Sequence, residues 1–142
     1  MKKIFLVFCL FFSLNSFAEI VIVVNQKLPF VIEKKDISKI YLGKIFTLNS
    51  ITLIPISLNE KSLKNEFLDK YLNLTEEQYT AYWTVRQYIG RGTTLVKEFE
   101  NVDEIIDFVE NNIGAIAYLD EKMVNKYSNN KIKIILKDID NK

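Results

Sequence analysis

The sequence predicts an α/β protein in which helices flank a central mixed sheet. Apolar, β-branched segments that are typical of buried strands alternate with amphipathic helical segments along the whole chain. Glycine and proline are scarce, with 4 and 2 residues, and 49% of the 142 residues are hydrophobic. A chain of this length is enough for one domain with a core. We find no internal repeat, low-complexity tract or interdomain linker.

The amino terminus is typical of a secretory signal peptide. Lys2 and Lys3 precede an uncharged apolar run, and the segment Ser16-Phe17-Ala18 has small residues at the two positions that a signal peptidase reads. The run is too short to span about 30 Å of bilayer as a helix. The alternative is a first core strand or helix. We expect residues 1–18 to be cleaved after Ala18, and residues 19–142 to form a periplasmic domain with no membrane span.

Export would also change the composition. Removal of the two amino-terminal lysines changes the net charge from +1 to −1, and Cys9, the one cysteine, lies in the removed segment. The chain has no histidine. These counts exclude Ser-His-Asp and Cys-His catalysis, zinc sites built on His or Cys, and disulfide scaffolds. The charge balance gives no indication of a nucleic-acid partner. We therefore predict no enzymatic activity, no cofactor and no metal site.

The first half of the exported chain predicts two strands and a helix. The β-branched run Glu19–Val24 is typical of a strand that is buried on both faces. Apolar residues at helical spacing predict a short helix over Lys34–Leu42, and Gly43 follows as a left-handed carboxyl-terminal cap. Ile51–Leu58 is a second apolar strand, in which Pro55 indicates an edge position or an irregularity.

The second half predicts three helices and two strands. Apolar spacing predicts a helix from Ser62 to Leu72, capped by the Ser62 hydroxyl. Thr75 and Gln78 form a capping box that opens another helix, and Asn101 begins a further one. Two more strands complete the order, Gly114–Leu119 and Lys131–Lys137.

Several of these segments, taken in order, resemble a known family. Leu42-Gly43-Lys44 after the first helix and the segment Gly114–Tyr118 are similar to the second lobe of the phosphate-binding protein of ABC transporters. The resemblance is to the small stand-alone PstS-like form of the type 2 periplasmic binding superfamily, and it covers Ile20 to Tyr118. It implies a single periplasmic-binding-protein-like lobe that binds a small oxyanion such as phosphate. Backbone N–H groups and hydroxyls at helix starts suit such a ligand.

Two loops are candidate ligand-binding elements. Lys61 and Ser62 lie at a predicted helix start, although Glu60 adds a negative charge that the family pattern lacks. The second loop consists of Gly90, Arg91, Gly92 and Thr93. Its glycines allow close approach of the backbone to a ligand, and the guanidinium suits an oxyanion. The simpler alternatives are a helix cap at Ser62, a solvated charge at Lys61, and a turn that ends the preceding helix.

Other chemistry-bearing clusters have simpler explanations. Tyr79, Tyr82 and Trp83 are suited to the floor of a sugar or base pocket, but their helical spacing is more typical of a core. The acidic cluster is expected to be a solvated helix face; it consists of Asp103, Glu104, Asp107 and Glu110.

Two functions therefore remain open. One is an oxyanion-binding lobe that acts alone or by pairing two copies. The other is an accessory protein that has kept the binding-protein fold but lost the ligand, and that docks onto an envelope protein or associates with itself.

Overall fold

The computed structural model describes residues 18–90, 96–127 and 130–137 of the chain. Apart from Ala18, the predicted signal peptide with Cys9 lies outside these residues, so it stays a prediction. The elements in chain order are β1 (Ile20–Asn25), α1 (Lys34–Tyr41), β2 (Thr47–Leu48), β3 (Ile51–Thr52), β4 (Ile54–Leu58), α2 (Lys61–Phe67), the π-helical turn η1 (Leu68–Leu72), α3 (Glu76–Tyr88), β5 (Lys97–Phe99), α4 (Val102–Asn111), β6 (Ala115–Asp120), α5 (Glu121–Val124) and β7 (Ile132–Lys137).

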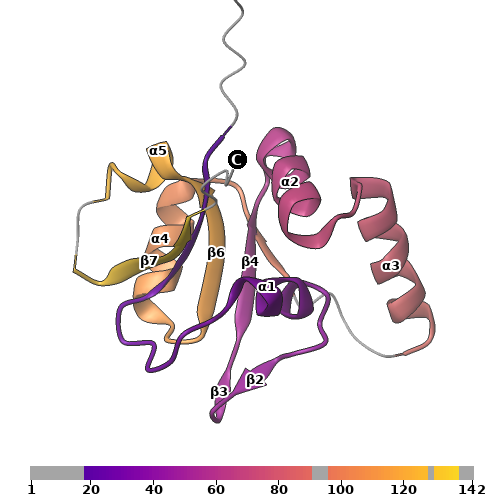
Figure 1. The fold of residues 1–142 in the computed structure, drawn as a ribbon, viewed down its shortest axis with the longest axis horizontal. Helices are drawn as coiled ribbons and strands as arrows, with labels where there is room; N and C mark the ends of the chain where they lie inside the picture. The colour runs from indigo at the N-terminus through magenta and orange to yellow at the C-terminus, as the bar shows by residue number, and fades with distance from the viewer. Residues whose placement is uncertain (1–17, 91–95, 128–129, 138–142) are drawn as a thin grey trace, which may run out of the picture.

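Five of these strands form one mixed sheet in the order β5-β4-β6-β1-β7. β4 is parallel to both of its neighbours, β5 and β6. β1 is antiparallel to both β6 and β7. Helix α4 covers one face, and α1 and α2 cover the other (Figure 1). The predicted α/β class, with a mixed sheet between helices, is confirmed.

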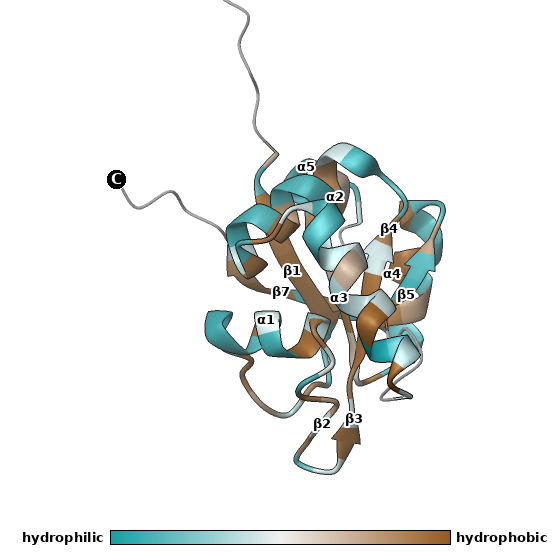
Figure 2. Ribbon diagram, turned by 90° about the vertical axis from the view of Figure 1, so that its right-hand side faces the viewer, coloured by the Kyte–Doolittle hydropathy of each residue, from teal (hydrophilic) through white to brown (hydrophobic). Residues whose placement is uncertain are grey.

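The core lies along the middle strands of the sheet. Every residue from Ile20 to Val24 is 0% exposed, as expected for a strand with helices on both faces. Figure 2 shows β1 as a hydrophobic ribbon, and the helices α1 and α2 as mainly hydrophilic ribbons. At the end of β1 the buried Asn25 side chain donates to the Val109 carbonyl oxygen at 2.8 Å. This bond ties the strand to the last turn of α4.

The single strand predicted over Ile51–Leu58 is divided in the structure. β3 pairs with β2 across a two-residue turn, in which Asn49 and Ser50 have φ values of 46° and 65°. Such a left-handed pair suits the twist of a short hairpin. Pro55 lies in β4, which is an interior strand, but β5 pairs with β4 only from Ile56 onward. On the β5 side, Pro55 is therefore unpaired. Proline is tolerated at this point because it has no N–H group that a neighbouring strand would need.

Two glycines have conformational reasons to be where they are. Gly43 follows α1 with a φ of 66°, which confirms the predicted left-handed cap. Gly114 lies just before β6, where an added Cβ atom would come within 1.9 Å of the Thr52 carbonyl oxygen. Only glycine therefore allows the β3 segment to pass this close to the start of β6.

The predicted caps of the later helices are confirmed. The Thr75 hydroxyl and the Gln78 side chain form the reciprocal capping box of α3, and Asn101 accepts from the Glu104 N–H group at the start of α4. The sequence did not indicate β2, β5 or α5, which have two, three and four residues. Within the described ranges, none of the helices combines the length and the apolar character that crossing a membrane requires.

Candidate functional site

The first predicted site element is the start of α2, just beyond the carboxyl end of β4. The helix begins at Lys61, so the prediction that Ser62 is the cap is wrong. Glu60 is the cap instead: its carboxylate accepts from the N–H groups of Ser62 and Leu63, with N···O distances of 3.2 and 2.6 Å. Lys61 and Ser62 are both exposed. The chain's own carboxylate therefore engages two of the free N–H groups at this helix start.

The second predicted element begins at Gly90, at the other end of the molecule. Gly90 has a φ of 69°, and its N–H group donates to the Gln87 carbonyl oxygen at 3.1 Å, so it closes α3. In Figure 1, α2 starts at the top of the view and α3 ends at the lower right. The rest of the loop, Arg91, Gly92 and Thr93, lies outside the described residues. The described part of the two elements does not converge on one cavity, and ligand binding by these residues stays a prediction.

The aromatic group on α3 fastens this helix to the end of α1. The Tyr79 hydroxyl donates to the Tyr41 carbonyl oxygen at 3.1 Å, and the Tyr82 hydroxyl donates to that of Leu42 at 2.7 Å. Trp83 is 5% exposed. Arg86 extends this set: its guanidinium donates to the Tyr82 hydroxyl at 2.9 Å. The expected core role is confirmed for Tyr79 and Trp83, which are buried, whereas Tyr82 is half-buried. The two tyrosine hydroxyls satisfy free carbonyl groups at the end of α1.

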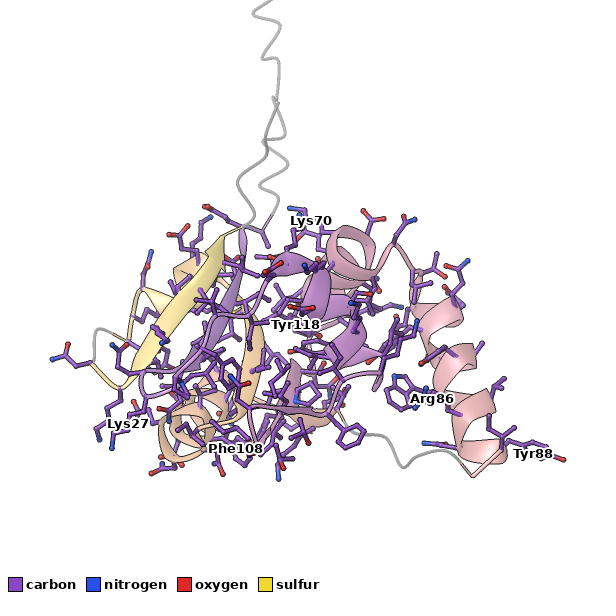
Figure 3. The ribbon with its side chains drawn as sticks, turned by 60° about the horizontal axis from the view of Figure 1, so that its bottom comes forward. Lys27, Lys70, Arg86, Tyr88, Phe108 and Tyr118 are labelled. Atoms are coloured by element: carbon purple, nitrogen blue, oxygen red, sulfur yellow. The ribbon has the colours of Figure 1, made fainter. Side chains whose placement is uncertain are left out.

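A cavity of about 220 Å³ lies between the sheet and the helices α2 and α3. It is lined mainly by aromatic and aliphatic residues, namely Tyr41, Phe67, Leu68, Tyr79, Val96 and Tyr118. Its polar lining residues are Ser57, Lys64 and Glu98. Figure 3 shows Tyr118 near the centre of the molecule, with Arg86 and Tyr88 on the outer helix to one side. The cavity therefore lies where the outer helix meets the sheet.

Two hydroxyl groups from neighbouring parallel strands form the floor of the cavity. Ser57 of β4 and Tyr118 of β6 are 4% and 1% exposed, and their oxygen atoms are 2.8 Å apart. Either hydroxyl could be the donor in this bond. Because each hydroxyl has one hydrogen and two lone pairs, the pair retains further capacity to accept hydrogen bonds.

Stacked rings form the wall of the cavity. The ring of Phe67 lies parallel to that of Tyr118, with an interplanar angle of 5° and centroids 3.8 Å apart. The ring of Tyr41 meets Phe67 edge-on at 4.7 Å. The Tyr41 hydroxyl is 2.8 Å from the Ile56 carbonyl oxygen, in β4. Burial of these groups fixes the wall in one arrangement.

The hydroxyl groups around the cavity remain neutral at ordinary pH. Burial raises the pKa of Tyr41 and Tyr118 well above the usual value, and it raises the pKa of Tyr79 to about 12. The negative charges of Glu98 and Glu60 raise the pKa of Tyr118 further. These groups are therefore hydrogen-bonding dipoles rather than phenolate nucleophiles.

The charges at the cavity are unequal. The Lys64 ammonium is 4.0 Å from a carboxylate oxygen of Glu76 and lies over the Tyr79 ring at 6.0 Å. Within the described part of the chain, the Glu98 carboxylate has no hydrogen bond or ion pair. The described ranges also hold no group of three or more acidic, His or Cys residues placed to bind a metal.

Of the residues that line this cavity, sequence reasoning considered Tyr79 for a pocket but missed the polar residues Ser57 and Tyr118. Ser57 is a lone hydroxyl in an otherwise apolar strand, and Tyr118 is the polar-tipped residue of the next strand. A buried polar group normally has a partner. That rule was the available signal, but the pairing joins residues 61 positions apart and depends on the register of β4 and β6.

No family model matches the chain, and no curated protein matches it. Among solved structures it is similar to an ABC-type phosphate transport receptor from Vibrio cholerae, with a TM-score of 0.52 and 14% identity. The match covers 83% of this chain but 45% of the receptor, so the chain spans less than half of that protein. At this identity the likeness concerns the fold alone. Residues 18–137, as far as they are described, therefore form a single α/β lobe, a mixed sheet between helices, whose fold is similar to part of this transport receptor.

Proposed function

We propose that this protein is an exported solute-binding domain for phosphate or another small oxyanion, with Lys61, Ser62 and the loop from Gly90 to Thr93 as its binding elements. The likeness to a phosphate transport receptor is the observation that carries this proposal. The exposed first turn of α2, beyond the carboxyl end of a parallel strand, supports it. Open α/β sheets bind ligands beyond the carboxyl ends of their strands.

Titration calorimetry of the purified protein with phosphate, sulfate and molybdate tests this proposal. Saturable binding of one of these anions is expected, and exchange of Lys61→Gln together with Ser62→Ala should weaken it. The matched control is Lys126→Gln, which removes an exposed lysine far along the chain. The absence of any response at millimolar concentrations would contradict oxyanion binding.

A second candidate function rests on Glu60. Its carboxylate already occupies the N–H groups of Ser62 and Leu63, where the ligand of an anion-binding helix would lie. The alternative is therefore an accessory protein that has kept the fold and docks onto an envelope protein.

The variant Glu60→Ala separates the two candidates. If the native protein ignores phosphate and the variant binds it, the internal carboxylate blocks the site and the accessory function is favoured. If the native protein binds phosphate and Glu60→Ala changes the affinity less than about 3-fold, a difference of less than 1 kcal/mol, the blocking role of Glu60 is wrong.

A further inference from the structure

We propose that the cavity between β4, β6 and α3 binds a small organic cation, an amine with a compact apolar or aromatic body. The described residues of the predicted oxyanion-binding elements, Lys61, Ser62 and Gly90, do not line it. It does not depend on the function proposed above. Three properties of the cavity carry the inference: its size and walls, the hydroxyl pair on its floor, and the charges beside it.

The size and the walls of the cavity determine how large and how apolar the body of the ligand can be. The volume of about 220 Å³ lies below the roughly 300–1,000 Å³ that is typical of drug-sized pockets. Phe67 and Leu68 contribute apolar side chains from α2 and η1, and Val96 closes the cavity from the side of β5. A ligand of about ten non-hydrogen atoms with an apolar body would bury its surface here without leaving polar groups unpaired.

The floor favours a hydrogen-bond donor. The Ser57 hydroxyl is also 3.5 Å from the Leu58 carbonyl oxygen, to which it can donate while it accepts from Tyr118. Both hydroxyl hydrogens are then used, and the oxygen atoms keep lone pairs that can accept from a ligand. An ammonium group suits this floor, because it donates up to three hydrogen bonds and carries a positive charge.

The neighbouring charges favour a cation over an anion. The positive charge of Lys64 is offset by Glu76 at 4.0 Å, whereas the carboxylate of Glu98 has no ionic partner within the described part of the chain. Glu60 is also close enough to influence Tyr118 electrostatically. Among the described lining residues, Glu98 thus offers an amine an unpaired negative charge, which a phosphate or a carboxylate would not find favourable.

A pair of probes of similar size and opposite charge tests the inference. Phenethylamine and 3-phenylpropionate are titrated separately into the purified full-length protein at neutral pH, with heat or thermal stabilisation as the readout. We expect phenethylamine to bind with a Kd of about 1 mM or tighter, and 3-phenylpropionate at least about 10-fold more weakly. Equal or tighter binding of the carboxylate, or no binding of the amine at about 10 mM, overturns the proposal.

Two variants locate the binding. Glu98→Gln should weaken phenethylamine about 10-fold without affecting the fold, because Glu98 is exposed and makes no described hydrogen bond. The matched control, Glu104→Gln in the first turn of α4 on the opposite face of the sheet, should leave the affinity unchanged. Equal losses in both variants would show a nonspecific charge effect and overturn the proposal.

A phosphate titration in the presence of phenethylamine keeps this site distinct from the function proposed above. We expect the amine to bind whether or not phosphate does. If the two ligands compete for one site, the separate cation site is wrong.

Discussion

The middle of the sheet and the outer helix α3 are stabilised in different ways. Ile20 to Val24 of β1 are 0% exposed, with helices over both faces of the sheet. α3 buries Tyr79 and Trp83, whereas Tyr88 is 91% exposed. Apolar burial therefore stabilises the first region, and a few hydrogen bonds and ring contacts stabilise the second. The cavity lies between these two regions, because its lining includes Tyr79 of α3 as well as Ser57 and Tyr118 of the sheet.

The largest difference between the regions is expected from removal of buried apolar atoms. Ile22→Ala should lower the free energy of unfolding by about 2–5 kcal/mol, because neighbours on both faces cannot collapse into the space. The matched change on the outer helix, Val85→Ala, should shift it by at most about 0.5 kcal/mol, because Val85 is 59% exposed. Urea denaturation of both variants measures this. Similar losses in the two variants would contradict the comparison.

Unfolding at alkaline pH tests the contribution of buried Tyr79, which lies where α3 meets the rest of the protein. The pKa of Tyr79 is raised by burial to about 12, above the value of about 10 in an unfolded chain. The folded state therefore favours the neutral form of Tyr79. The resulting contribution to the free energy of unfolding is fully present below about pH 10. It is lost as the pH rises toward 12, and for this group alone the loss is about 3 kcal/mol.

Denaturation of the native protein between pH 8 and 12 measures this loss. In the control variant Tyr79→Phe, the free energy of unfolding should fall less steeply as the pH rises. The variant lacks the one proton that Tyr79 releases on unfolding in this pH range. An unchanged slope would show that Tyr79 is not responsible.

The close approach of Thr52 in the hairpin to Gly114 provides a test of packing at the start of β6. Gly114→Ala places a Cβ atom within 1.9 Å of the Thr52 carbonyl oxygen, so the hairpin must move. A loss of about 1–3 kcal/mol is expected, measured by thermal or urea denaturation. The neighbouring change Ile113→Val is the control and should have little effect, because Ile113 is 43% exposed.

The smallest expected effect concerns one hydroxyl group of the outer helix. Tyr82→Phe removes the 2.7 Å bond to the Leu42 carbonyl oxygen and the 2.9 Å bond from the Arg86 guanidinium, and it should cost about 0.5–1.5 kcal/mol. Amides of α3 should exchange hydrogen faster, while those of β1 keep their protection. The control Tyr88→Phe should change neither. Faster exchange in β1 would mean that the two regions unfold together.

Local features of the fold could be predicted from the sequence. The capping box at Thr75, the cap at Asn101 and the left-handed Gly43 depend on neighbouring residues, and all three are confirmed. One local prediction was wrong: the cap of α2 is Glu60 rather than Ser62, and glutamate is not among the preferred capping residues. The three-residue β5, which depends on its pairing with the distant β4, was not recognised.

The two candidate sites also differ in whether neighbouring or distant residues form them. Lys61, Ser62 and Gly90 could be proposed because their sequence neighbours indicated helix ends. The cavity could not be predicted in this way, because its floor joins Ser57 to Tyr118 through the pairing of β4 with β6. Which strands become neighbours depends on the packing of the helices between them, and no short segment contains that information.

The sequence by itself determined the α/β class and the buried character of β1, because hydrophobic period and capping are properties of neighbouring residues. Only the tertiary structure decided that Glu98 faces an aromatic cavity without an ionic partner among the described residues. The physical reason is that hydrogen bonds, rings and charges act over a few ångströms in space. Chain folding alone brings Ser57, Glu98 and Tyr118 within that range.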